Sequence, residues 1–299
     1  MPESLVIEAS DLRKNFGQVE GLRGLDLQVP AGSIHGFLGR NGAGKTTTLK
    51  ILLGMTRPTG GDARVFGMAA DRRDSSVEIR RRTGFVSEDK DLYEYMTVEQ
   101  MIRFTAAFYP RWRRDLEQRY RPRFDLPADR EVKALSRGMR TKLALLLALC
   151  RGAELLILDE PTSGLDPAVT EEVLQALVAH VASEEMTVFF SSHQIAEVEQ
   201  IADRVTIIDR GQAVITGALE DLRQKYRRVQ LVFDGDAPQI VFHAAGVVRV
   251  ERSGRTLTVL SSAGSEGIIE ETAAFNPVSV DVLPVSLKEI FLETVTEKN

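Results

Sequence analysis

The pattern of apolar and polar residues changes its period several times along the chain. Apolar and polar positions alternate near Leu5–Leu12 and Leu25–Val29, which is typical of half-buried antiparallel strands. The runs Ile34–Leu38 and Leu155–Leu158 are mostly apolar instead, as expected for strands buried on both faces of a parallel sheet. The sequence therefore predicts two kinds of strand in one chain.

Helical spacing dominates the middle of the chain, over residues 98–149. Thr97, with Gln100 three residues later, predicts a capping box at the start of the first helix. The predicted apolar stripe of that helix comprises Val98, Met101, Ile102, Thr105 and Phe108.

Strand and helix alternate again after Leu155. Strands are expected at Thr187–Ser191 and Arg204–Ile208, and Asp166 followed by Pro167 predicts the N-cap of a helix between Leu155 and the first of them. This alternation indicates an α/β fold with a largely parallel sheet covered by helices.

The pattern changes once more after about Gly217. Strands are expected at 229–233, 247–251, 256–261 and 278–283, and helices near Pro238–Ala244 and Gly264–Phe275. Ser286 and Glu289 predict a capping box for a last helix. The order β-α-β-β-α-β plus a helix is that of a small α+β, ferredoxin-like unit. We predict domains at 1–218 and 219–299, with a helical subdomain at about 90–150 in the first; the second is either regulatory or purely structural.

A glycine-rich loop joins the strand Ile34–Leu38 to a helix-forming run, Thr46–Leu53. The segment Gly39–Thr46 fits the phosphate-binding pattern G-x-x-x-x-G-K-[ST], in which backbone N–H groups and a helix N-terminus surround phosphate oxygens. Lys45 is expected to reach the β- and γ-phosphates, and the Thr46 hydroxyl to ligate Mg²⁺. A chance glycine-rich turn is the alternative. The loop residues expected to bind nucleotide are Gly39, Asn41, Gly42, Ala43, Gly44, Lys45, Thr46 and Thr47.

Two carboxylates end the apolar strand at Leu155–Leu158. Because open α/β sheets bind ligands at the carboxyl ends of their strands, Asp159 is expected to hold Mg²⁺, directly or through water. Glu160 is expected beside the γ-phosphate, as the general base that polarises the attacking water. A pair of solvated carboxylates is the alternative.

The composition limits the function classes that remain. A length of 299 residues with 43% apolar residues is ordinary for a globular protein of one to two domains. The net charge of −5 argues against an electrostatic nucleic-acid binder. No export signal is visible, and the longest apolar run, Leu143–Cys150, is far shorter than the ~20 residues of a membrane helix. We expect a cytoplasmic, water-soluble chain that is able to attach to a membrane protein.

Three more motifs stand in order around the phosphate loop and the acidic pair. Leu135–Met139 precedes the acidic strand, Ser163–Asp166 follows it, and Ser191–His193 closes the next strand. Over about residues 4–217 the chain resembles an ABC ATPase, the nucleotide-binding subunit of an ABC transporter. The resemblance implies the ABC ATPase form of the P-loop NTPase fold, with a mostly parallel core sheet, an antiparallel β subdomain and a helical subdomain.

The resemblance also implies roles for matching residues. Phe16 resembles the aromatic residue that stacks on adenine, and His193 the switch histidine that contacts the γ-phosphate and orders the attacking water. On their own, the first is equally a core phenylalanine and the second a structural or surface histidine. Ser136 and Gly138 resemble signature residues that bind the γ-phosphate of an ATP held by the other protomer, and Asp166 a residue that acts across the dimer interface. An ATP-dependent two-fold dimer follows, of identical or related chains.

Two motifs depart from the family pattern. Arg137 and Met139 stand where the signature usually has glycine and glutamine. Glu88 stands where the family usually has a glutamine near the metal; its carboxylate is still a Mg²⁺ ligand, but it adds negative charge near the γ-phosphate. These departures, and the C-terminal run Val285–Leu292, resemble bacterial exporter subunits.

The sequence thus predicts an ATPase that uses ATP and Mg²⁺ to power a bacterial exporter of drugs, antibiotics or lipids. Its expected partners are a multi-span membrane permease at the inner face of the cell membrane and a second ATPase subunit, with no nucleic acid. The alternative is a soluble ABC ATPase that acts on ribosomes or DNA. Such proteins usually carry two ATPase domains or long coiled-coil insertions, which this sequence lacks.

Overall fold

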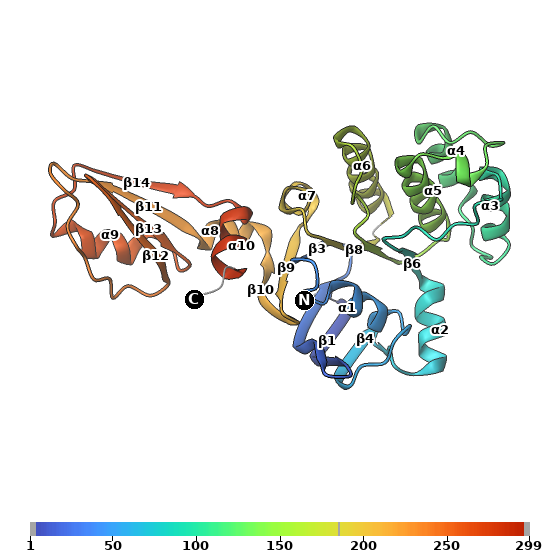
Figure 1. Ribbon diagram of the computed structural model, residues 1–299, viewed down its shortest axis with the longest axis horizontal. Coiled ribbons are helices and arrows are strands. Elements are labelled where there is room, and N and C mark those ends of the chain that lie inside the picture. Colours follow the sequence, from blue (N-terminus) through green and yellow to red (C-terminus); the bar gives the residue numbers. More distant parts are fainter. Residues whose placement is uncertain (1–3, 185, 296–299) are drawn as a thin grey trace. The chain divides into compact units, whose positions relative to one another are not determined.

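The computed structural model of the chain describes residues 4–184 and 186–295. The chain divides into two units, Met1–Thr216 and Gly217–Asn299 (Figure 1). Each unit contains a cluster of buried apolar side chains of its own. Within the described ranges, no helix has the length and apolar character needed to cross a bilayer.

An antiparallel sheet opens the first unit. Its strands lie in the order β2-β1-β4-β5, and their bounds are Leu5–Phe16 (β1), Val19–Pro30 (β2), Gly60–Val65 (β4) and Met68–Ala69 (β5). The predicted alternation is confirmed over Leu25–Val29, where every second side chain from Leu25 is buried and the two between them are exposed. In β1 it is interrupted between Ala9 and Leu12, where the pairing with β2 shifts register. Strands β1 and β2 are longer than predicted and pair up to Phe16 and Val19, at the tip of their hairpin.

A six-stranded sheet forms the centre of the first unit, in the order β10-β9-β3-β8-β7-β6. The strands are Ile34–Leu38 (β3), Thr83–Val86 (β6), Leu155–Asp159 (β7), Thr187–Ser192 (β8), Arg204–Asp209 (β9) and Gln212–Ala218 (β10). Pairing is parallel from β9 through β3, β8 and β7 to β6, as the apolar runs predicted. Because Leu38 pairs with Ser192 and Asp159 with Ser191, three motif-bearing strands end side by side.

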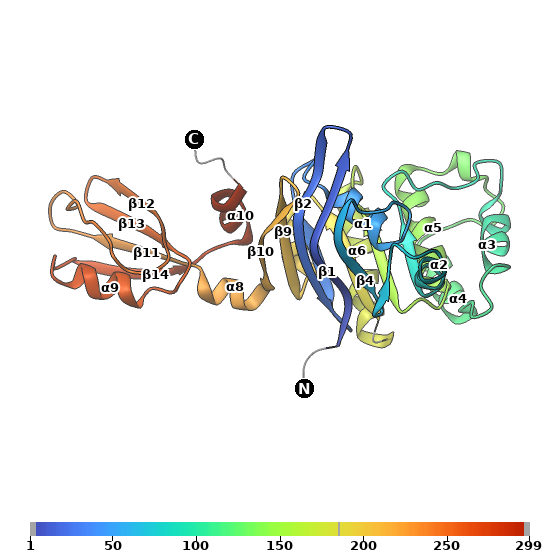
Figure 2. The same ribbon diagram turned by 90° about the horizontal axis from the view of Figure 1, so that it is seen from below.

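Helices cover both faces of this sheet, as Figures 1 and 2 show. They are Lys45–Leu52 (α1), Arg73–Arg82 (α2), Pro167–Glu184 (α6) and Ile195–Ile201 (α7). Helix α1 contacts β4 and β7, so it packs between the two sheets, whereas α6 and α7 contact β8 on the other face. Asp166 caps α6 as predicted: its side chain accepts a hydrogen bond from the Val169 N–H at 3.0 Å.

The middle of the chain is helical, as predicted. It contains Val98–Ala106 (α3), Arg114–Arg123 (α4), a 3₁₀ turn at Val132–Ala134 and Arg137–Cys150 (α5). The capping box of Thr97 and Gln100 is confirmed. The prediction for Phe108 is wrong: α3 ends at Ala106, and the side chain of Phe108 is 65% exposed.

The second unit is a four-stranded antiparallel sheet in the order β12-β13-β11-β14. Its elements are Leu219–Lys225 (α8), Arg227–Val232 (β11), Val247–Ser253 (β12), Thr256–Ser261 (β13), Glu266–Ala273 (α9), Ser279–Pro284 (β14) and Leu287–Val295 (α10). Figure 2 shows α9 alongside the sheet. The Ser286 capping box is confirmed, because the Glu289 N–H donates to Ser286 Oγ and the Ser286 N–H to Glu289 Oε2.

One predicted helix of this unit, near Pro238–Ala244, is wrong. The segment has no regular secondary structure. Ile240, Phe242 and Ala244 pack on the apolar cluster, whereas Val241 between them is 74% exposed. This two-residue period is that of an extended chain, and β-branched and aromatic side chains favour it over a helix.

Candidate active site

The phosphate loop connects β3 to α1, and two of its glycines have left-handed backbones. Gly42 has φ 81° and Gly44 has φ 110°. A Cβ at Gly44 would lie 2.7 Å from Leu22 Cδ2, and one at Gly39 would lie 2.6 Å from the Ile208 carbonyl oxygen. Side chains are therefore excluded at Gly39 and Gly44 by the strands packed behind the loop.

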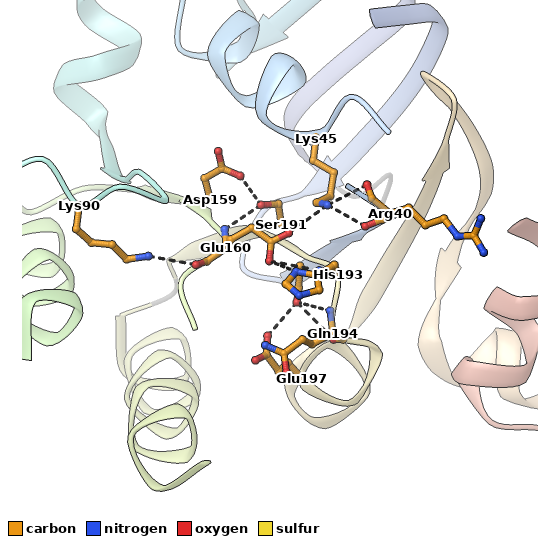
Figure 3. A network of polar contacts seen from close by, with 11 residues as sticks. Arg40, Lys45, Lys90, Asp159, Glu160, Ser191, His193, Gln194 and Glu197 are labelled. Carbon is orange, nitrogen blue, oxygen red and sulfur yellow. Dashed lines mark hydrogen bonds and ion pairs between the residues drawn. The ribbon is translucent and has the colours of Figure 1, made fainter. Parts of the chain in front are cut away.

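Lys45, the first residue of α1, is 6% exposed and points back across the loop (Figure 3). Its Nζ donates to the carbonyl oxygens of Gly39 at 2.8 Å and Arg40 at 3.3 Å. The same Nζ lies 3.1 Å from Glu160 Oε1, as an ion pair that lacks hydrogen-bond alignment. Carbonyls and one carboxylate thus hold the ammonium at the mouth of the loop.

Glu160 follows β7 and is buried, with 5% exposure. Its Oε2 lies 2.7 Å from Nδ1 of His193, whose side chain is 41% exposed. An ionised carboxylate only accepts hydrogen bonds, so Nδ1 is the donor in this pair. The backbone of Glu160 is left-handed, with φ 47°, which turns its carboxylate toward Lys45 and His193.

Ser191 orders the acidic pair, a role that the sequence reasoning missed. Its hydroxyl donates to Asp159 Oδ1 at 2.6 Å and accepts a hydrogen bond from the Glu160 N–H at 3.0 Å. The signal in the sequence was weak, because a serine before the histidine motif is explained equally well by the end of a buried strand. Only the parallel register between β7 and β8 reveals the contact.

Glu197 is a further buried carboxyl group near His193, and it was also missed. Its Oε2 accepts a hydrogen bond from the Ser192 hydroxyl at 2.9 Å. The Ser192 Oγ in turn accepts a hydrogen bond from the Gln194 N–H at 2.9 Å. These bonds fix the turn that carries His193. Burial raises the pKa of Glu197; hydrogen bonds from Thr162 and Ser192 act against this, and the nearby Glu160 adds to it.

We expect Glu197→Gln to stabilise the first unit at pH 8. With the raised pKa, the folded state binds the Glu197 proton more tightly than the unfolded state does. Below the ordinary pKa of 4.5 both states are protonated, and as pH rises through the folded pKa the folded state must ionise a buried group. Glutamine has no such cost, so its advantage in urea unfolding shrinks as pH falls toward 4.5.

Glu270→Gln, on the exposed surface of α9, is the control for this comparison. A stability gain of Glu197→Gln that stays constant or grows between pH 8 and pH 4.5 would contradict the buried-carboxyl explanation.

A cavity of about 560 Å³ lies over the ends of these strands. Its lining residues are Phe16, Gly21, Asn41, Gly42, Gly44, Lys45, Thr46, Thr47, Glu88, Glu160, Ser163 and His193. Phe16 is 53% exposed at its rim, with Lys14 Nζ 5.1 Å from the ring centroid. A Cβ at Gly21 would lie 3.2 Å from the Phe16 ring, so the glycine leaves that ring its space.

Some predicted site residues lie outside this lining. Asp159 is buried and hydrogen-bonded to Ser191, and Gly39 and Ala43 are also buried and are not among the lining residues. Ser136 caps α5, accepting from the Met139 N–H at 3.2 Å. Gly138 and Asp166, at the starts of α5 and α6, are likewise absent from the lining.

The residues around the cavity fit a nucleoside triphosphate with Mg²⁺. Thr46 and Glu88 line the cavity together with Lys45. Hydroxyl and carboxylate oxygens are hard donors that suit Mg²⁺, which also retains water and takes phosphate oxygens. No cluster of three or more His, Cys, Asp or Glu ligands occurs in the described parts of the chain, so a cage made of protein ligands alone is not present there.

A glycine-rich loop between a buried parallel strand and a helix, with a buried lysine at its end and carboxylates at the end of a nearby strand of the same sheet, is the arrangement of a phosphate-loop nucleotide hydrolase. The family model for the ABC transporter matches residues 22–163. The chain is 31% identical to the bacitracin transport ATP-binding protein BcrA of Bacillus licheniformis, over 97% of this chain and 95% of that protein. It therefore belongs to the ABC transporter ATP-binding family and is an ATPase.

Two further comparisons agree with this assignment. The Nod factor export ATP-binding protein I of Cupriavidus pinatubonensis is 34% identical over 73% of this chain and 67% of its own length. A solved structure of an ATP-binding subunit of an ABC transporter, 28% identical, covers 73% of this chain and 92% of that one with a TM-score of 0.65. The predicted fold of the first unit is confirmed by this likeness.

Proposed function

We propose that this ATP-binding subunit powers a bacterial exporter of an antibiotic, drug or lipid-like compound. The observation that carries the catalytic part is the Glu160 carboxylate, held 3.1 Å from Lys45 and 2.7 Å from His193 at one cavity. The export part rests on the similarity to the bacitracin and Nod factor transport proteins. Attachment to a permease would place the chain at the inner, cytoplasmic face of the cell membrane.

Each site residue has a defined task in hydrolysis of the γ-phosphate. The Lys45 ammonium stabilises charge that develops on the β- and γ-phosphate oxygens. Glu160 accepts a proton from the attacking water, and His193 contacts the γ-phosphate through the ring edge turned away from Glu160. Phe16 stacks on adenine at the rim. Mg²⁺ would neutralise phosphate charge, held by Thr46 and Glu88 in the cavity and by Asp159 behind it.

A second ATPase subunit would complete the site. Ser136 and Gly138 do not line the cavity that contains Lys45, although Ser136 offers a hydroxyl at a helix N-terminus. In a two-fold dimer the signature residues of one chain would face the phosphate loop of the other, with Asp166 at the interface. A pair of identical chains and a pair of related chains both satisfy this arrangement.

An exposed group of aromatic side chains supports the permease partner. It comprises Tyr93, Tyr95, Phe104 and Phe108, which we call the aromatic surface; its members are 38–70% exposed. Tyr93 contacts both Tyr95 and Phe104, and Phe104 contacts Phe108, with ring centroids 5.1–5.8 Å apart. Contiguous exposed aromatic rings of this kind mark protein–protein contacts.

We expect the aromatic surface to be required for capture of a membrane partner. Tagged Glu160→Gln protein, purified from detergent-solubilised native membranes with ATP and Mg²⁺, should bring down a multi-span membrane protein. Adding Tyr95→Ser and Phe108→Ser should reduce that recovery about tenfold or more, because buried aromatic anchors dominate interface energies. In an otherwise wild-type chain, the same two changes should leave ATP hydrolysis by the isolated chain unaltered, since neither residue lines the cavity.

Phe275→Ser is the matched control, because Phe275 is 43% exposed in the second unit. Recovery of ribosomal or other soluble partners in place of a membrane protein would favour an ABC ATPase that acts outside a transporter. Unchanged recovery of the membrane protein by the Tyr95→Ser, Phe108→Ser chain would contradict the docking role of the aromatic surface.

A further inference from the structure

Two residues beside the cavity share an unusual backbone conformation. Lys90, in the segment between β6 and α3, has φ 49°, and Glu160 has φ 47°. Left-handed backbones are uncommon in residues other than glycine, and they persist where surrounding contacts hold them. In Glu160 this backbone conformation directs the carboxylate toward Lys45 and His193. The contacts that maintain the conformation therefore help to orient the proposed base.

The side chain of Lys90 supplies such a contact. The residue is 9% exposed, and its Nζ donates to the carbonyl oxygen of Glu160 at 3.2 Å and to that of Glu88 at 3.0 Å. Figure 3 shows the lysine extending toward the backbone of Glu160, on the side opposite Lys45 and His193. One ammonium group therefore joins the two turns that carry Glu88 and Glu160.

Charged groups of both signs lie near this buried lysine. Burial lowers the pKa of Lys90, and the Arg137 guanidinium lowers it further, whereas Glu88, Asp159 and Asp89 act in the opposite direction. The hydrogen bonds of Nζ go to the backbone carbonyl oxygens of Glu88 and Glu160, so the contact with Glu160 is made to its main chain and leaves its carboxylate free to face the cavity.

We infer that Lys90 is a positioning residue for hydrolysis: it holds the backbone of Glu160 in the conformation that aims the carboxylate at Lys45 and His193. The inference rests on the assignment of Glu160 as the base. Lys90 does not line the cavity, so it acts on turnover rather than on nucleotide affinity. It also ties the base to the segment that continues to Tyr93 and Tyr95 of the aromatic surface.

Three substitutions distinguish the effect of the Lys90 ammonium group from the effect of the left-handed backbone at this position. Lys90→Met keeps the apolar stem and loses the donor; Lys90→Asn suits a left-handed backbone but is too short to reach Glu160; Lys90→Arg keeps a cation. We expect the methionine and asparagine variants to lower kcat about tenfold to hundredfold with little change in KM for ATP, because small errors in placing a catalytic group have effects of that size. The arginine variant should recover part of the rate.

The outcome is decided by the pattern among these variants. Wild-type turnover in Lys90→Asn would make Lys90 a turn residue only, and wild-type turnover in Lys90→Met would overturn the inference outright. Arg210 is another basic residue with positive φ on an exposed turn, so Arg210→Asn controls for the effect of asparagine on folding. The thermal unfolding of every variant is measured as well.

A double variant distinguishes failure of this inference from failure of the proposed base. If Lys90 acts through Glu160, adding Lys90→Met to Glu160→Gln should cause little further loss of turnover. Full additivity of the two losses would contradict a shared path. A slow Glu160→Gln with a normal Lys90→Met removes only the inference about Lys90, whereas a normal Glu160→Gln removes the assignment of the base on which it rests.

Discussion

Glu160→Gln is expected to slow ATP hydrolysis by about 10²-fold or more while ATP binding is retained. Glutamine has nearly the shape of glutamate, but its amide cannot take a proton from water. Its oxygen is still able to accept the hydrogen bond that His193 Nδ1 makes to Oε2 at 2.7 Å, and Lys45 keeps its bond to the Gly39 carbonyl. The substitution therefore removes the group that accepts the proton and leaves the residues that bind the phosphates in place.

Single-turnover hydrolysis and equilibrium ATP binding, measured on the same preparation, test this expectation. Glu154→Gln is a matched control. Glu154 lies immediately before the first residue of the same strand, β7, at the end away from the cavity, and pairs with Arg82 at the surface. Near-normal turnover in Glu160→Gln would show that another group activates the water. Weakened ATP binding with normal turnover of the bound fraction would instead assign Glu160 to binding.

Local motifs explain why much of this chain was predictable from its sequence. Two apolar runs predicted the buried parallel strands β3 and β7, and the residues that follow them, from Gly39 and at Asp159, carry the phosphate loop and the acidic pair. Caps such as Thr97 and Asp166 also depend only on neighbours within three residues, and both were predicted correctly. The catalytic roles of Glu160 and His193 stay predictions.

Features that depend on long-range packing were not predictable in this way. The bonds from Ser191 to Asp159 and from Lys90 to Glu160 join residues 32 and 70 positions apart, and no local pattern marks them. A helix at Pro238–Ala244 was predicted from the order of elements alone. The segment is extended instead, because alternate side chains pack on the apolar cluster of the second unit. Phe108 fits a helical stripe by spacing, yet the helix ends before it.

Lys45→Met is expected to weaken ATP binding by about 10²-fold or more, because a charge-assisted contact to phosphate is lost from a buried site. The Lys45 ammonium is 6% exposed, and no other lysine or arginine lines the cavity among the residues that the structure describes. Lys50→Met, an exposed lysine in the last turn of the same helix, is the control. Equilibrium binding of a fluorescent ATP analogue measures both variants, and wild-type affinity in Lys45→Met would remove Lys45 from the phosphate site.

The same variant tests whether the site is held together by its buried charges. Lys45 and Glu160, 6% and 7% exposed in their side chains, form a buried pair, and removing one partner of such a pair typically costs about 3–5 kcal/mol because the other charge loses its counter-ion. Without Lys45, the Glu160 carboxylate keeps its hydrogen bond from His193 Nδ1. Lys45→Met should therefore lower the unfolding temperature without nucleotide, and adding Glu160→Gln should restore most of it. If the double variant is no more stable than Lys45→Met, the loss of stability comes from packing of the lysine stem rather than from its charge. A weakened binding of ATP by Lys45→Met would then have to be separated from misfolding before it is assigned to the phosphate contact.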